Sequence, residues 1–164
     1  MSRLALAAAG GLLLVLLTTS LGSSETIRLS DRPVTIQVAL PEQLVAKQKA
    51  TTDEVGALLR VEGVSTEPPE TATVRVFVER PAATGDTPVS DAQFVGYFTL
   101  VPRNARSAGP KEGQSFLFEL PRRLLAPALN RSSIQVTFVP VSGASARPTV
   151  IVRRTSVELP RSGS

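Results

Sequence analysis

The chain of 164 residues contains no histidine, no cysteine and no tryptophan, and these absences exclude most metal and nucleophilic chemistry. A coupled pair of copper ions needs several neutral imidazole ligands, so this chain cannot build such a site. Zinc sites made from His and Cys, Cys-His dyads and Ser-His-Asp triads are excluded on the same ground. No disulfide can form, so stability must come from a core and from strand pairing. We expect no metal and no cofactor.

Carboxylates are the main groups left for catalysis or for calcium. Asp53 and Glu54 lie in a charged connecting segment, where acidic side chains are usually solvated. Asp86 and Asp91 lie in a segment rich in turn residues, where Asp commonly accepts hydrogen bonds from the backbone. We therefore expect no catalytic residues and predict that the protein is not an enzyme.

Aromatic residues are also scarce, at 4% of the chain, although hydrophobic residues reach 42%. The apolar content comes from Val, Leu, Ala and Ile, which suits a sheet core better than a surface that stacks bases or sugars. We expect no nucleic-acid partner, and we expect the binding partner to be a protein rather than a saccharide.

The net charge of +4 comes from basic residues that are scattered rather than gathered in a stripe. Arginines that alternate with apolar residues along a strand usually form the solvated face of a half-buried sheet. Two pairs of adjacent arginines and the basic loop after residue 102 are the best candidates for contacts with a partner. These candidates are Arg103, Arg106, Arg122, Arg123, Arg153 and Arg154.

The amino terminus has the pattern of a secretory signal. Arg3 precedes an apolar run from Leu4 to Leu17, and small residues follow it. We predict a signal peptide over residues 1–22, cleaved after Gly22, and hence an exported protein, periplasmic or secreted. The alternative is an uncleaved membrane anchor formed by residues 4–21.

Beyond the signal, short alternations of apolar and polar residues predict about eight strands in one domain over residues 26–159, with a disordered tail at 160–164. Regular spacing of this kind predicts an all-β fold, an antiparallel β-sandwich of jelly-roll type. The region from Glu42 to Val55 is either a loop or a short surface helix, and Leu124 to Leu129 is a helical turn. The expected strands are Val34–Leu40, Leu58–Val64, Val74–Val78, Gln93–Val101, Phe116–Leu120, Ser133–Val139 and Thr149–Leu159, the last interrupted at Arg153 and Arg154.

Local patterns predict three further details. Apolar residues on both faces of Gln93–Val101 predict a central strand, with Gly96 at a bulge or a close approach. Phe77 lies on the face opposite Val74, Val76 and Val78, so this strand is either covered on both sides or meets a partner. The segment Ser142–Ser145 is expected to be a hairpin loop.

Three segments in a fixed order carry a resemblance to a known family: Leu59–Val64, Thr73–Val78 and Gln93–Pro102. They resemble the β-rich carboxy-terminal domain of polyphenol oxidases, the tyrosinase and catechol oxidase family. In that domain a strand of the Lys-Phe-Asp-Val type precedes a strand of the Phe-x-Gly-x-Phe-x-x-x-Pro type. Arg75 and Phe77-Val78 stand in a looser version of the first motif. The copper-binding domain is missing, so the resemblance does not carry the activity over.

The resemblance implies a shielding or assembly role, because in such oxidases this domain packs over the copper site and keeps the enzyme latent. We expect a non-catalytic domain that acts through protein contact and caps or assembles a separately encoded copper oxidase. The loops Pro81–Asp91 and Arg103–Gly113 are where a partner would be met. The alternative is a general periplasmic or extracellular binding or structural module with no oxidase partner.

Overall fold

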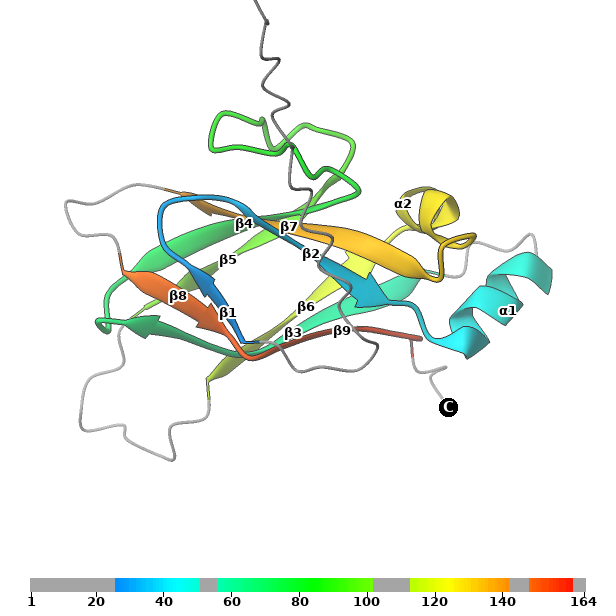
Figure 1. Cartoon of the computed structure of the whole chain (residues 1–164), viewed down its shortest axis with the longest axis horizontal. Helices are drawn as coiled ribbons and strands as arrows, with labels where there is room; N and C mark the ends of the chain where they lie inside the picture. The colour runs from blue at the N-terminus through cyan, green and yellow to red at the C-terminus, as the bar shows by residue number, and fades with distance from the viewer. Residues whose placement is uncertain (1–25, 51–55, 102–112, 142–147, 161–164) are drawn as a thin grey trace, which may run out of the picture.

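The computed structural model describes residues 26–50, 56–101, 113–141 and 148–160 (Figure 1). The expected signal peptide, the hairpin loop at Ser142–Ser145 and all but the first residue of the expected tail lie outside them. Within the described residues there are nine strands, so the predicted all-β sandwich is confirmed. The strands are β1 (Ile27–Leu29), β2 (Val34–Ala39), β3 (Ala57–Glu67), β4 (Ala72–Val78), β5 (Phe94–Leu100), β6 (Gln114–Leu120), β7 (Ser133–Val141), β8 (Thr149–Val152) and β9 (Arg154–Glu158).

The strands form two antiparallel sheets. Sheet 1 has the order β1-β8-β3-β6, with β9 also paired to β3, and sheet 2 has the order β2-β7-β4-β5. The strands β7 and β8, which flank the expected hairpin loop, lie in different sheets and do not pair. The hairpin prediction was therefore wrong, because the chain crosses from one sheet to the other at that point.

The core lies between the two sheets and is built by the period-two alternation of the strands. On β4, Val74, Val76 and Val78 are fully buried, and on β3 Leu59 and Val61 are fully buried as well. Phe98 of β5, Phe118 of β6 and Phe138 of β7 supply the largest side chains of the same cluster. The scarcity of aromatic residues therefore fits a core filled mainly by branched aliphatic side chains.

Gly63 bends the long strand β3. Its φ of 64° is a left-handed conformation that glycine adopts readily. A side chain there would bring its Cβ within 2.7 Å of the Cβ of Arg153. On the other side, the backbone of Gly63 lies so close to Gly113 that a Cβ on Gly113 would meet it at 2.3 Å. Two glycines thus permit the close approach of β3 and β6 at this bend.

The strand β5 is an edge strand, so the predicted central position was wrong. Phe98 and Leu100 are buried, whereas Tyr97 and Thr99 between and beside them are exposed. The predictions for Gly96 are confirmed. The β4–β5 register shifts by one residue at Gly96, and a Cβ there would lie 2.9 Å from the ring of Phe118 on β6.

Two helical segments complete the described chain. The region predicted to be either a loop or a short surface helix contains the helix α1 (Glu42–Ala50), and its Leu44 is fully buried. The helix α2 (Arg122–Leu125) continues as a 3₁₀ turn (Ala126–Ala128), which confirms the predicted helical turn. Among the described residues no helix has the length and apolar character needed to cross a membrane.

Candidate protein-contact surface

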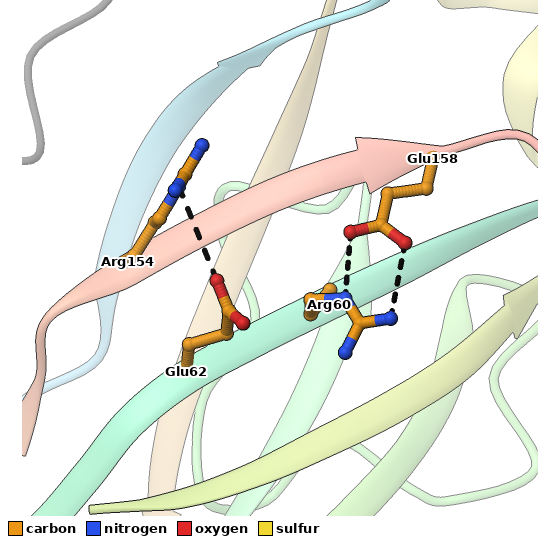
Figure 2. Close-up of polar contacts among 4 residues, drawn as sticks. All are labelled: Arg60, Glu62, Arg154 and Glu158. Carbon is orange, nitrogen blue, oxygen red and sulfur yellow. Dashed lines mark hydrogen bonds and ion pairs between the residues drawn. The ribbon is translucent and has the colours of Figure 1, made fainter. Parts of the chain in front are cut away.

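The outer face of sheet 1 carries paired charges. Figure 2 shows Arg60 and Glu62 on β3 beside Glu158 and Arg154 on β9. Arg60 donates to both carboxylate oxygens of Glu158, at 2.6 Å from Nε and 3.1 Å from Nη2. Arg154 lies 4.0 Å from Glu62. The hydrogen bond to Glu158, and then the charge of that carboxylate, raise the pKa of the Arg60 guanidinium above its ordinary value.

These charges stand outward because their neighbours on β3 point inward. Leu59 and Val61 are fully buried in the core, so the alternation places Arg60 and Glu62 on the opposite side. About a third of the Arg60 and Glu158 side chains is exposed, and Arg154 is more exposed still. Ion pairs in such positions contribute little to stability and are screened by salt. This face is therefore a solvated surface, and the four charged side chains of Figure 2 find partners within the chain.

The outer face of sheet 2 differs, because the segment of residues 79–93 folds over it (Figure 1). Phe77 and Val139 point away from the main core, yet both are buried and form a second small cluster with Ala83 of that segment. Phe94 packs against Phe77, with ring centroids 5.4 Å apart. Thus β4 is apolar on both sides because its outer side is covered by the chain itself.

Arg75 holds this segment to the sheet. Its Nη1 donates to the carbonyl oxygens of Gly85 at 3.1 Å and of Thr87 at 3.2 Å. The hydroxyl of Thr35 on β2 donates to the carbonyl of Pro81 at 3.4 Å and pairs at 2.9 Å with the hydroxyl of Thr137. The loop predicted to meet a partner is therefore tied to sheet 2 at its middle and at its start.

Glu79 fixes the point where the chain leaves β4. This residue has a φ of 55°, and the exposed fraction of its side chain is only 14%. Its carboxylate accepts a hydrogen bond from the backbone N–H of Gln135 at 2.9 Å and another from the guanidinium of Arg131. At the other end of the segment, the carboxylate of Asp91 accepts from the N–H of Gln93 at 2.9 Å, as expected for an Asp in a turn.

Among the residues that the structure describes, the two predicted arginine doublets do not lie in one patch. Arg103 and Arg106 lie outside the described residues. Arg122 is half-buried and Arg123 exposed at the start of α2, just after β6. Arg153 and Arg154 are exposed at the β8–β9 junction. The end of β6 pairs with Ala57, while the register places Arg153 opposite Gly63, so the two doublets are separated by six positions along β3, or about 20 Å.

Sequence reasoning missed a set of exposed apolar side chains. Tyr97 is 64% exposed, Val101 62%, Val89 54% and Leu117 50%. The alternation of Tyr97, Thr99 and Val101 was visible in the sequence, and the polar Thr99 was the signal that this side of the strand faces solvent. The described residues hold no group of three or more acidic side chains that could bind a metal ion.

A comparison with protein families matches residues 26–159 to the chloroplastic polyphenol oxidase C-terminal domain. The match spans the whole of the described sandwich. The chain belongs to this family. The predicted resemblance is therefore confirmed, and polyphenol oxidase C-terminal domains are the non-catalytic part of their enzymes.

Solved structures show the same fold. A recombinant latent aurone synthase, a polyphenol oxidase, matches with a TM-score of 0.54 and 20% identity, over 82% of this chain and 25% of its own. The latent aurone synthase from its natural source gives 0.55 and 19%, over 79% of this chain and 24% of its own. Latent apple tyrosinase matches with a TM-score of 0.50 and 22% identity, over 82% of this chain and 27% of its own. This polyphenol oxidase C-terminal domain thus spans about a quarter of the chains that it matches. None of the curated proteins compared matches it.

Proposed function

We propose that this chain is a non-catalytic domain that acts by contact with another protein, and that it caps or assembles a copper oxidase of the tyrosinase type. The observation that carries the proposal is the family match over residues 26–159 in a chain of 164 residues without a single histidine. A copper pair needs imidazole ligands, so the oxidase must be supplied by a polypeptide segment outside these residues.

The outer side of sheet 2 supports a contact role. The sandwich is rigid enough to present a surface, because the segment 79–93 is held by Arg75, Thr35 and Glu79 rather than left loose. Apolar side chains remain exposed on this segment, at Val89, and beside it, at Tyr97. We further propose that the domain acts after export, on the strength of the apolar run from Leu4 to Leu17 that follows Arg3.

The test is affinity capture of the tagged protein from an extract of its own source, followed by mass spectrometry of what is bound. Phenol oxidation by the captured enzyme is then measured while purified domain is added in increasing amounts. We expect recovery of a histidine-rich copper oxidase whose rate falls, or whose copper loading changes, as the domain is added. The intact mass of the source protein checks export, since cleavage after Gly22 leaves Ser23 at the amino terminus.

Two outcomes would count against the proposal. If reproducible capture yields only envelope components, the general binding or structural module becomes the better description. If an oxidase is captured but neither its rate nor its copper content responds to the domain, contact is retained and the capping and assembly roles are lost. An ordinary globular protein of similar size and charge serves as the control for non-specific adsorption.

A further inference from the structure

The exposed apolar side chains are unequally shared between the two sides of the sandwich. Of the four large apolar residues that are at least half exposed in the described chain, three belong to the sheet 2 side: Val89, Tyr97 and Val101. Only Leu117 stands on the outer side of sheet 1, directly opposite Arg60 of the neighbouring strand β3. Apolar residues that gather on one side are typical of surfaces that meet another protein.

Arg75 brings the strand and the loop together on that side. It pairs across the sheet with Tyr97, and its guanidinium donates to the carbonyl of Thr87, two residues before Val89. The hydroxyls of Thr73 and Thr99 pair at 3.0 Å in the next outward row of the same strands. We call the surface made by Val89, Tyr97, Thr99 and Val101 the β5 face.

The β5 face is also uncharged along its strand, since the chain has no charged residue from Phe94 to Val101. On sheet 1, by contrast, β3 and β9 place charged side chains outward, among them the two ion pairs Arg60–Glu158 and Arg154–Glu62. A partner group with a net charge would lose its water opposite the β5 face and find no opposite charge on β5 itself, and the nearby guanidinium of Arg75 is already engaged with the carbonyl oxygens of Gly85 and Thr87. The complementary surface is therefore uncharged and apolar or aromatic.

We propose that the β5 face is the surface through which this domain contacts the oxidase, and that it packs against an uncharged apolar surface of the oxidase's catalytic part. The inference rests on the proposed function, because that function supplies the partner. The aromatic Tyr97 is its central anchor, since large aromatic side chains commonly dominate the binding energy of an interface. The charged outer face of sheet 1 stays in solvent.

The experiment compares matched substitutions on the two sides in the full chain. Tyr97→Lys and Thr99→Lys place a charge on the β5 face, and Leu117→Lys places the same charge on the outer side of sheet 1. All three positions are exposed strand residues, so each variant should fold, and circular dichroism with thermal unfolding checks this. Val101→Lys replaces any β5-face variant whose unfolding midpoint falls. Affinity for the captured oxidase is measured by surface plasmon resonance.

We expect Tyr97→Lys to weaken binding by about tenfold or more, as for a central interface residue, with a smaller loss for Thr99→Lys. Leu117→Lys should bind like the unmodified chain. Equal binding by all variants, or a loss confined to Leu117→Lys, would overturn the inference and leave the proposed function standing. Failure of the unmodified chain to bind any oxidase would overturn the proposed function itself, and the inference with it.

Discussion

The two outer faces of this sandwich differ in how their side chains meet water. On sheet 1 charged side chains that point outward from β3 and β9 pair with each other, as in Arg60 with Glu158, and they remain in solvent. On sheet 2 the outward Phe77 and Val139 are apolar, and the chain covers them with its own segment 79–93. One face needs no cover, and the other obtains it by folding a loop across the sheet.

The difference shows that a loop can act as a third layer. Thr137 points outward from sheet 2 and is nevertheless fully buried, which requires a covering layer above it. The segment is fixed by donors and acceptors of the sheet, so its position is part of the fold rather than a separate conformational choice. Apolar residues left at its margin, such as Tyr97, then remain available to a partner.

The largest expected effect comes from removing the apolar contact under the loop. Phe77→Ala deletes a fully buried ring from the second cluster and should lower the free energy of unfolding by about 3–5 kcal/mol. Chemical denaturation measures the loss, and Phe77→Leu, which keeps most of the volume, is the control. A loss below 1 kcal/mol for Phe77→Ala would show that the covering layer contributes nothing, and the comparison of the faces would fail.

A smaller effect is expected from the polar attachment of the same loop. Arg75→Met keeps an apolar stem but removes the donor to Gly85 and Thr87, which should lower the free energy of unfolding by about 1–3 kcal/mol. Limited proteolysis should then cut within residues 81–91, where the unmodified chain resists. Unchanged resistance to protease would mean that the apolar cluster alone holds the loop.

The smallest effect is expected on the other face. Arg60→Met removes the partly exposed ion pair with Glu158, and the unfolding midpoint should move less than in Arg75→Met. The difference from the unmodified chain should shrink further in concentrated salt, because surface ion pairs are screened. A shift as large as that of Arg75→Met, and insensitive to salt, would contradict the view of sheet 1 as a merely solvated face.

Much of the fold followed from local pattern. Period-two alternation located the strands around Val34–Ala39 and Ser133–Val141, because burial on one face imposes that period on any sequence. Whether a strand is central or at an edge depends instead on pairing with distant segments. For β5 the apolar residues on both sides suggested a central place, yet Tyr97 and Val101 are exposed and only one neighbour, β4, pairs with it.

The candidate contact surface was harder to foresee. The arginine doublets at Arg122 and Arg153 were chosen for their charge, but the sheet register places them far apart. The burial of Phe77 by Ala83 could not be read from either segment alone, since Ala carries no distinctive pattern. Three-dimensional neighbours decide such surfaces, and a single sequence records them only indirectly.

At Gly63 the strand β3 keeps a different pairing register with its neighbours on either side. From Glu62 to Ser65 the strand advances three residues while β8 and β9 also advance three, so that register is unbroken. From Val61 to Val64 it advances three while β6 advances only two. Deleting Gly63 would therefore remove the extra residue from the β3–β6 pairing. It would also shift the β3–β8 register by one residue, turning the inward Val150 and Val152 toward water. The number of residues at this bend is thus set by two pairings, one with a bulge and one without, and neither a gain nor a loss of one residue preserves both.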